Sequence, residues 1–481
     1  MKQLYLMYPQ KKGTIAPEVY GHFTEHIGGV FYDGLWVGKD SDIPNVKGFR
    51  KEIIDKLRAI KAPVVRWPGG CYAEVYDWRD GIGEERPSRI NWWTSWDNRY
   101  EPNAVGTHEF MDFCEAVGAA AYIASNLTSV TPLHARNWMD YCLSPRGTTA
   151  LAKEREKNGH PEPFNVPFWG VGNENWGGGG NMEPEYYAME YRRFSELMYN
   201  AFPKCEFYAC GSDSDKFNWT HGVMRTLENS GKHLNGYAMH YYCGSAGDPV
   251  AFTEDEWDKQ LKQAAYMEDI IQRNWNIICG YGMEDKAKLV VDEWGCWHPD
   301  GSGPSKGYNL FEQQSTMRDA MVTALTLNIF NNHCDKVRMA NAAQMVNNLH
   351  ALFLASGEHC ITTPTYHVFD MYKEHQGAEA ITVTVTENDE LKSSVTVSAS
   401  VKDGKTLLTL GNLSCREDAV LELLSVGGTL PETAEGVLLQ ADDMHAHNTF
   451  EVPENVKPAA VTVDLTKPLT VPKAAILAIR F

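Results

Sequence analysis

Eight short apolar runs follow one another up to about residue 370, and the stretches between them show helical periodicity. Near-continuous apolar runs of this kind are typical of parallel strands that are buried on both faces. Eight strand–helix units predict an α/β protein with a (β/α)8 TIM barrel. An open doubly wound sheet is the alternative, although no Gly-x-Gly-x-x-Gly fingerprint follows the first run. The runs end in segments 19–26, 62–70, 120–126, 167–175, 206–214, 236–242, 288–294 and 336–344.

Three of the intervening stretches predict helices with recognisable ends. Apolar residues repeat at helical spacing over 49–60, and again over 110–117, where Thr107 is expected to be the N-cap. Pro184 is expected in the first turn of a helix that runs to about Asn200, because proline suits that position.

The character of the chain changes after Gln376, where alternating, β-branched and turn-rich segments begin. They predict a C-terminal antiparallel β-sandwich, jelly-roll-like in form, with a hairpin turn in 401–406. We therefore expect a catalytic barrel over 15–372 and a sandwich domain over 373–481. The N-terminal strand 1–14 is expected to join the sandwich.

Net charge and the pattern of cysteines limit which partners and which cellular compartment the protein can have. A net charge of −19 argues against nucleic acid and against anionic membranes as partners. The N-terminal residues lack the apolar region of a secretory signal, and no window approaches 18 apolar residues. The 11 cysteines include no Cys-x-x-Cys pair, which is typical of reduced thiols in a cytoplasmic protein.

Nearly every predicted strand ends in a polar side chain. The active site of a TIM barrel lies at the carboxyl ends of its strands, so these side chains are expected to converge on one polar pocket. They are Glu25, His26, Arg66, Cys71, Asn126, Asn173, Glu174, Asp213, His240, Tyr242, Glu293, Trp294, Asn341 and Gln344.

Among the carboxylates in this set, Glu174 and Glu293 stand out because they are expected on roughly opposite walls of the barrel. Glu174 ends the fourth strand and Glu293 ends the seventh, so both can flank one substrate atom. Paired carboxylates across a scissile bond are the machinery of glycoside hydrolysis, in which one donates a proton and the other stabilises or attacks the anomeric carbon. Either glutamate alone could instead be a helix cap or a salt-bridge partner.

Several motifs resemble those of the glycoside hydrolase family 51 α-L-arabinofuranosidases, of clan A. They include "GHFTEHIGG", "RWPGGCYAEVYDWRDGIG", "WGVGNENWGGGG", "VVDEW" and "ANAAQMVNN", and the likeness extends from about residue 15 to the C-terminus. The resemblance implies a retaining mechanism. It also implies no cofactor and no metal, because both chemical steps need only carboxyl groups and water.

The resemblance assigns roles to the catalytic residues. Glu174 matches the general acid/base and Glu293 matches the nucleophile, and their carboxyl groups are expected ~5 Å apart, as in retaining enzymes. Arg66 matches an arginine under the nucleophile, where its charge would favour ionised Glu293. Asn173 matches the residue that binds the sugar 2-hydroxyl. Glu25 matches a carboxylate that holds sugar hydroxyls.

Further positions are implied to bind substrate. His240 and Tyr242 match residues near the catalytic carboxylates, with the tyrosine positioning the nucleophile, and Trp297 and Gln344 match residues that line the sugar subsite. Position 71 is a cysteine where part of the family has asparagine, so the contact of Cys71 with the primary hydroxyl of the sugar is left open.

Two features outside these motifs have more than one interpretation. Trp92, Trp93 and Trp96 lie in an insert after the second strand and could form a platform for the leaving group or a subunit contact. His445 and His447 could ligate a metal, but an ordered loop is the preferred interpretation because they lie in the predicted sandwich.

The sequence therefore predicts a cytoplasmic, exo-acting α-L-arabinofuranosidase of arabinan degradation. It would release terminal non-reducing α-L-arabinofuranosyl residues from arabinose-containing oligosaccharides. The alternatives are the same machinery on a galactofuranoside, a xyloside or a β-glucan, and a non-catalytic sugar-binding protein. The family resemblance also implies a homo-oligomer, a trimer or a hexamer.

Overall fold

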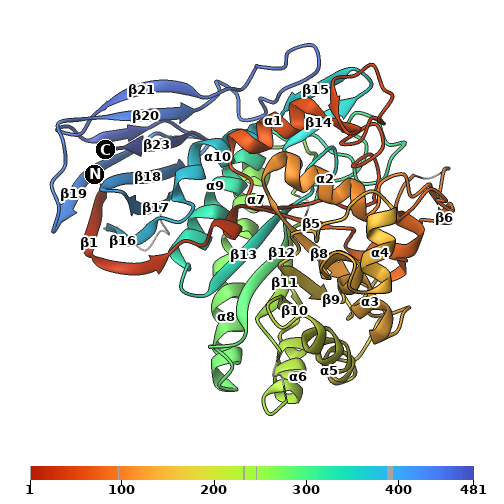
Figure 1. Ribbon diagram of the computed structural model, residues 1–481. Coiled ribbons are helices and arrows are strands. Elements are labelled where there is room, and N and C mark those ends of the chain that lie inside the picture. The colour runs from red at the N-terminus through yellow and green to blue at the C-terminus, as the bar shows by residue number, and fades with distance from the viewer. Residues whose placement is uncertain (1, 96, 231–232, 245, 387–393) are drawn as a thin grey trace.

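The computed structural model describes residues 2–95, 97–230, 233–244, 246–386 and 394–481. It contains a closed barrel and a separate, mostly antiparallel sheet that lie side by side (Figure 1). No helix within the described residues is both long enough and apolar enough to cross a membrane.

Eight parallel strands close the barrel in the order β10-β11-β12-β13-β2-β5-β8-β9. Each of the eight predicted apolar runs contains one of these strands, so the predicted TIM barrel is confirmed and the doubly wound alternative is wrong. The strands are β2 (Gly21–Phe23), β5 (Val64–Trp67), β8 (Ala120–Ser125), β9 (Phe168–Val171), β10 (Glu206–Asp213), β11 (Gly236–Cys243), β12 (Lys288–Cys296) and β13 (Val337–Ala343).

A layer of large side chains fills the lower interior of the barrel. Tyr122 and Tyr208 meet edge to face with ring centroids 5.4 Å apart, and Phe168 stacks on Tyr208 at 6.0 Å. Val290 and Met339 complete the same buried cluster. A barrel filled in this way has no pore, so a cavity can form only above this layer, at the carboxyl ends of the strands.

Helices surround the barrel. The helix starting at Pro184 ends at Ala201, and a helix begins and ends within 49–60, as predicted. The helices are α1 (Lys51–Ala59), α2 (Thr107–Val117), α3 (Pro132–Leu143), α4 (Ala150–Lys157), α5 (Pro184–Ala201), α6 (Phe217–Leu227), α7 (Glu254–Ala265), α8 (Met267–Gly280), α9 (Met317–Asn332) and α10 (Pro364–Tyr372), with the 3-10 turns η1 (Pro17–Tyr20), η2 (Cys71–Val75), η3 (Trp78–Gly81) and η4 (Lys373–His375).

The predicted N-cap of α2 is wrong. Gly106 caps the helix, and Thr107 is its first residue. The Gly106 N–H donates to Glu109 Oε2 at 3.0 Å, and a Cβ at position 106 would lie 1.9 Å from the Gly81 carbonyl oxygen. The Thr107 hydroxyl instead accepts a hydrogen bond from Trp138 Nε1 at 3.1 Å. A close backbone approach, which the sequence does not reveal, decides the cap.

The second sheet has nine strands in the order β21-β20-β23-β18-β17-β16-β1-β19-β22. Its first strand in the chain, β1, pairs antiparallel with β16 and parallel with β19. The predicted hairpin is confirmed: Asp403 and Gly404 join β17 to β18 and both have positive φ, as a type I′ turn requires. The strands are β1 (Lys2–Thr14), β16 (Glu379–Thr386), β17 (Val395–Lys402), β18 (Lys405–Asn412), β19 (Ala419–Val426), β20 (Thr433–Leu439), β21 (Ala459–Asp464), β22 (Leu469–Val471) and β23 (Ile476–Arg480).

Helix α9 joins the barrel to this sheet (Figure 1). It is buried along its length, and its Asn328 and Asn331 bond to Ser398 of β17 at 2.7 and 3.1 Å. We propose the domain boundary between residues 372 and 373, at the end of α10. Short two-stranded ribbons complete the fold: β3 (Asn45–Val46) with β4 (Phe49–Arg50), β6 (Arg89–Ile90) with β7 (Tyr100–Glu101), and β14 (Phe353–Ser356) with β15 (His359–Thr362).

Candidate active site

A cavity of about 220 Å³ lies at the carboxyl ends of the barrel strands. A hollow of about 850 Å³ between α3 and α5 is larger, but Glu196 is the only carboxylate among its lining residues. The smaller cavity instead brings three glutamates together. Its lining residues are Glu25, Ile27, Gly70, Cys71, Trp93, Glu174, Gly178, Tyr242, Glu293, Trp297, Phe311, Gln344 and Leu349.

Glu174 and Glu293 face each other across this cavity. One oxygen of each carboxyl group lies within 4.8 Å of the other and of a His240 ring nitrogen. His240 Nδ1 is 2.8 Å from Glu174 Oε1 and 3.6 Å from Glu293 Oε1. The spacing agrees with the ~5 Å of retaining glycosidases and is shorter than the roughly 6.5–9.5 Å that would leave room for an attacking water.

Glu293 is held as an anion by its neighbours. Arg66 Nη1 donates to its Oε1 at 2.8 Å, and the Tyr242 hydroxyl donates to its Oε2 at 2.8 Å. Burial alone would raise the pKa of Glu293, but the positive charges of His240 and Arg66 and these hydrogen bonds outweigh it and hold the pKa below its usual value. The carboxylate is therefore ionised at neutral pH.

Arg66 connects this carboxylate to the packed interior of the barrel. Its Nε lies 3.3 Å from Asp292 Oδ2, which also accepts a hydrogen bond from the Tyr122 hydroxyl at 2.7 Å. Its Nη2 donates to Asn173 Oδ1 at 2.6 Å. The guanidinium therefore fixes side chains of β12 and of the segment that follows β9 at once.

The glycine run after Glu174 allows the backbone to turn tightly beside the cavity. Glu174 itself has a φ of +45°, and its carbonyl oxygen accepts hydrogen bonds from the backbone of Gly177 and Gly179. A Cβ at Gly179 would lie 1.7 Å from the Asn173 carbonyl oxygen, and one at Gly178 would lie 2.6 Å from Cys71 Sγ. Larger residues at these two positions would push the loop away from Glu174.

Cys71 contacts the carboxyl group of Glu174, with Sγ 3.6 Å from Oε2. Burial, followed by the negative charge of Glu174, raises the pKa of the Cys71 thiol far above its usual value. The side chain is therefore a neutral thiol that can donate a weak hydrogen bond.

Two further titratable groups surround the catalytic pair. Glu25 accepts hydrogen bonds from the Tyr72 N–H at 3.1 Å and from Gln344 Nε2 at 2.9 Å, and burial, with the charge of Glu293, raises its pKa to about 8. Burial lowers the pKa of His240, but the charge of Glu293 and the contacts with Glu174 outweigh it and raise the pKa to about 9. At neutral pH, His240 is a cation and Glu25 is mostly protonated.

Two buried polar atoms beside the cavity have no partner within the described part of the chain: Asn173 Nδ2 and Gln344 Oε1. Buried polar groups in folded proteins nearly always find a partner, so each exception calls for a reason. A sugar hydroxyl could accept from the first atom and donate to the second.

Aromatic side chains form the outer wall. Trp297 is 40% exposed and meets Tyr242 and Phe311 edge to face, at 5.2 Å in each case. The tryptophans of the insert lie in different surroundings: Trp93 lines the cavity, whereas Trp92 is 62% exposed and stacks near the Arg99 guanidinium. Trp96 lies outside the described residues.

Polar strand ends do not all reach the cavity. Asp213 pairs with Lys216 at 3.3 Å, and His26 bonds to Glu101 at 3.1 Å. Asn126 Nδ2 donates to the Ser129 hydroxyl at 2.7 Å, and Asn341 Nδ2 donates to Asp292 Oδ1 at 3.4 Å. None of these residues lines the cavity: Asn341 contacts strand β12, and the others contact the segments around the site.

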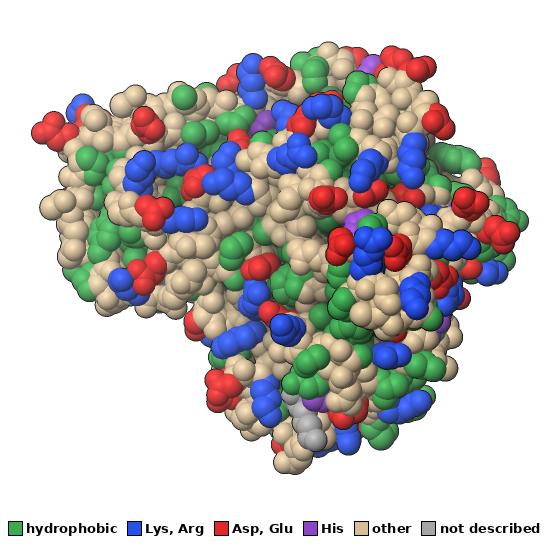
Figure 2. Space-filling view, viewed as in Figure 1, with side chains coloured by type: hydrophobic (Ala, Val, Ile, Leu, Met, Phe, Trp, Pro, Cys, Tyr) green, Lys and Arg blue, Asp and Glu red, His purple; other side chains and the backbone are tan. Residues whose placement is uncertain are grey.

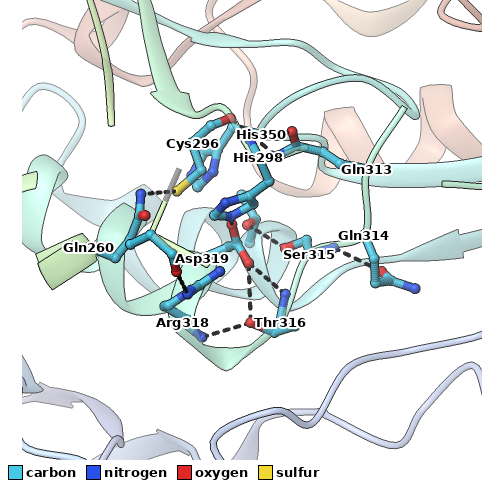
Figure 3. Close-up of polar contacts among 12 residues, drawn as sticks. Gln260, Cys296, His298, Gln313, Gln314, Ser315, Thr316, Arg318, Asp319 and His350 are labelled. Carbon is cyan, nitrogen blue, oxygen red and sulfur yellow. Dashed lines mark hydrogen bonds and ion pairs between the residues drawn. The ribbon is translucent and has the colours of Figure 1, made fainter. Parts of the chain in front are cut away.

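A second group of potential metal ligands lies just beyond Glu293 in the chain (Figure 3). Cys296, His298 and Asp319 are buried, with His298 Nε2 2.9 Å from Asp319 Oδ1. Asp319 Oδ2 accepts from the Thr316 N–H at 2.8 Å, so both carboxyl oxygens have protein partners without an ion. His445 is likewise bonded through both ring nitrogens, to Asp443 and to the Phe252 carbonyl. We assign no metal site to either group.

The same close-up shows how the strand end beyond Glu293 is anchored (Figure 3). Gln313 Nε2 donates to the Cys296 carbonyl at 3.2 Å, and Gln313 Oε1 accepts from the His298 N–H at 2.8 Å. One side chain therefore clamps the backbone on both sides of Trp297. Its position in "FEQQST" gives no sequence signal for this role, because its partners are backbone groups.

Sequence reasoning also missed several lining residues. Phe311 and Leu349 reach the cavity from long loops and both have positive φ, at 62° and 52°. Neither position carries a pattern that marks it. Gly178, by contrast, lies in the glycine run that follows Glu174, and this run is visible in the sequence.

Family models match most of the chain. One described as "Alpha-L-arabinofuranosidase 1 domain" matches residues 56–262, and one described as "Alpha-L-arabinofuranosidase C-terminal domain" matches residues 292–474.

Named relatives are similar over most of their length. The chain is 37% identical to an "Intracellular exo-alpha-L-arabinofuranosidase" of Bacteroides ovatus, covering 94% of this chain and 89% of the relative. It is 30% identical to an "Intracellular exo-alpha-(1->5)-L-arabinofuranosidase" of Halalkalibacterium halodurans, covering 72% and 70%.

Solved structures match over the whole chain. The GH51 arabinofuranosidase from Xanthomonas axonopodis pv. citri has a TM-score of 0.92 and 36% identity. The α-L-arabinofuranosidase from Thermotoga maritima, solved as an arabinose complex, has a TM-score of 0.89 and 27% identity. Both matches cover 100% of each chain.

Proposed function

The chain belongs to the glycoside hydrolase family 51 α-L-arabinofuranosidases, and we propose that Glu174 is its general acid/base and Glu293 its nucleophile. The protein is a retaining glycoside hydrolase that releases terminal non-reducing α-L-arabinofuranosyl residues from arabinose-containing oligosaccharides. The observation that carries the proposal is the pair of carboxyl groups in one cavity, with an oxygen of each within 4.8 Å of the other.

The reaction takes two steps. In the first, the Glu293 carboxylate attacks the anomeric carbon while Glu174 gives its proton to the departing glycosidic oxygen, so a glycosyl-enzyme ester forms. In the second, ionised Glu174 takes a proton from water, and the water oxygen attacks the anomeric carbon from the face that the leaving group has vacated, opposite Glu293, and displaces the Glu293 carboxylate. Two inversions leave the anomeric configuration unchanged, and Glu174 ends the cycle protonated.

The surroundings of Glu293 support its role as the nucleophile. A nucleophile must be ionised, and Arg66, His240 and Tyr242 all favour the ionised form of Glu293. Glu174 contacts no arginine or lysine among the described residues; its partners are His240 and the neutral thiol of Cys71.

Sugar binding is proposed for the residues around the pair. Glu25 and Gln344 together present a protonated carboxyl group and an unpaired carbonyl oxygen, and Asn173 offers an unpaired amide N–H to the 2-hydroxyl. Trp297 and Cys71 would close the pocket. Its volume of about 220 Å³ is below the roughly 300–1,000 Å³ of sites for larger ligands, so it suits one terminal sugar and exo action.

A panel of 4-nitrophenyl glycosides tests the sugar. We expect 4-nitrophenyl α-L-arabinofuranoside to be hydrolysed, with the β-D-galactofuranoside, β-D-xyloside and β-D-glucoside slower in kcat/KM by about 100-fold or more, because hydroxyl groups left unpaired in a polar pocket are costly. The double variant Glu174→Ala/Glu293→Ala is the background control. If another glycoside were hydrolysed faster, that sugar, and not arabinofuranose, would be the substrate. Turnover of no glycoside would favour a sugar-binding protein.

Variants of each glutamate test the roles separately. Glu174→Ala should lower kcat/KM by about 100- to 10,000-fold on an arabinoside with a poor leaving group, and far less on a dinitrophenyl arabinoside, which needs little protonation. Added azide needs no base and should restore turnover with a product of retained configuration.

Glu293→Ala removes the nucleophile, so kcat/KM should fall by a similar factor on substrates with good and with poor leaving groups. Any azide product should then have inverted configuration, because azide attacks directly. If the two variants exchanged these behaviours, the roles would be exchanged, and near-normal turnover by both would contradict the proposed mechanism.

The hydrogen bond from Tyr242 to Glu293 predicts a pH effect. Tyr242→Phe removes a donor to the carboxylate, so the pKa of Glu293 should rise. Because the attacking form is ionised, the acidic limb of the pH profile of kcat/KM should move to higher pH, by about one unit. Tyr186→Phe, at an exposed position on α5, is the control. A limb that stayed in place or moved to lower pH would argue against Glu293 as the group that titrates there.

We propose that the protein is cytoplasmic. The two relatives above are named intracellular, and all 11 cysteines of this chain are free thiols, which supports a cytoplasmic enzyme. In the view of Figure 2, acidic and basic side chains are interspersed over the surface. Such a surface does not suggest binding to a polyanion.

We propose a homo-oligomer, a trimer or a hexamer, as the family resemblance implies. The exposed apolar side chains of Leu133, Met189 and Leu197 line one surface hollow and support a buried contact there. Light scattering should therefore give a mass that is a multiple of 54.0 kDa, and a mass near 54.0 kDa itself would contradict assembly.

A further inference from the structure

Glu74 is a buried carboxylate that the reaction scheme does not use. It lies in the η2 turn after β5, and its side chain accepts four hydrogen bonds. Oε1 accepts from the Asn173 N–H at 2.6 Å and from Asn175 Nδ2 at 2.9 Å. Oε2 accepts from the backbone N–H groups of Leu127 and Thr128, both at 2.8 Å.

All four partners of Glu74 are N–H donors, so the carboxyl group must be ionised to satisfy them. Burial raises the pKa of Glu74 above its usual value, because the four hydrogen bonds that act in the opposite direction do not fully offset it. No lysine, arginine or histidine pairs with it in the part of the chain that the structure describes. The negative charge is therefore held by amide groups alone.

Two of these amides flank Glu174 directly. Glu74 Oε1 binds the residue before Glu174 and the residue after it, so it holds both ends of the backbone segment that carries the acid/base. Glu174 has a φ of +45°, a left-handed conformation that side-chain-bearing residues adopt only where the surroundings enforce it. The Glu74 contacts on either side of Glu174 hold this turn, together with the hydrogen bonds from the Gly177 and Gly179 N–H groups to the Glu174 carbonyl oxygen.

The same short turn reaches the site at two other points. Cys71, at the start of η2, contacts Glu174 Oε2 at 3.6 Å, and the Tyr72 N–H donates to Glu25 Oε1 at 3.1 Å. The other oxygen of Glu74 ties this turn to the loop after β8. Glu74 thus joins the ends of β5, β8 and β9 through one side chain.

We propose that Glu74 is a positioning residue that fixes Glu174 in its proton-donating orientation by bonding both neighbours of Glu174 at once. This inference rests on the proposed role of Glu174 as acid/base. A glutamine could not replace Glu74, because one of its two terminal groups is a donor and would face two N–H groups, whichever way the amide is turned.

Leaving-group dependence separates this role from a merely structural one. A misplaced acid slows only those substrates that need protonation. Glu74→Gln should therefore lower kcat/KM by about 100-fold on a methoxyphenyl arabinofuranoside and by less than about tenfold on a dinitrophenyl arabinofuranoside, because displacement of a catalytic group by about 1 Å costs about that much.

The matched control is Glu109→Gln. Glu109 is also a buried glutamate that accepts hydrogen bonds, from the Gly106 N–H and from Arg86, but it does not line the cavity. Glu109→Gln should change kcat/KM by the same factor on both substrates. Glu74→Asp keeps the charge and both acceptor oxygens on a shorter side chain, and it should restore part of the lost activity on the methoxyphenyl substrate.

Asn175→Ala provides a second route if Glu74→Gln does not fold. It removes one of the four donors and should show the same selective loss on the methoxyphenyl substrate, to a smaller extent. Equal losses on both substrates, or no loss, in the folded variants would overturn the inference.

Glu174→Ala is measured in parallel to separate two kinds of failure. If Glu174→Ala discriminates between the leaving groups and Glu74→Gln does not, only the role of Glu74 is wrong. If Glu174→Ala does not discriminate, the assignment of Glu174 as the acid is wrong, and the Glu74 inference is overturned with it.

Discussion

The buried guanidinium of Arg66 is the group on which the rest of the site depends. It lies against Glu293 and Asp292 and donates to Asn173, all at a depth where water is excluded. Burial would favour the protonated form of Glu293, and the charges of Arg66 and His240 reverse that preference. Removing one partner of such a buried pair typically costs about 3–5 kcal/mol, because the other charge is left uncompensated. An ionised Glu293 and a stable barrel top therefore require the same side chain.

Contacts from the barrel interior and from a neighbouring loop hold the side chains of the site in place. In the packed barrel interior, Tyr122 bonds to Asp292, which holds Arg66, so the position of Glu293 is tied to the barrel core. At the side, Gln313 clamps the backbone around Trp297. Close packing leaves such groups few alternative arrangements. A site assembled from several strand ends is therefore as rigid as the barrel itself, which suits catalysis by preorganised groups.

Much of this architecture is predictable from the sequence because it depends on local patterns. The eight apolar runs predict the eight strands, since buried parallel strands need continuous apolar residues. The strand ends then predict that Glu174 and Glu293 meet, because a barrel gathers the carboxyl ends of its strands on one face. Asn126 and Asp213 end their strands in the same way but serve local loops, since a position in the sequence does not fix where a side chain points.

The sequence alone determined the barrel, the β-rich second part and the identity of the paired carboxylates. Tertiary structure decided the contacts between segments far apart in the chain. Gly106 replaces Thr107 as the cap of α2 because the Gly81 backbone passes too close for any side chain. Glu74 acquires its role only because residues 127, 128, 173 and 175 are folded around it. Such contacts have no period and no motif, and only the packed fold brings their partners together.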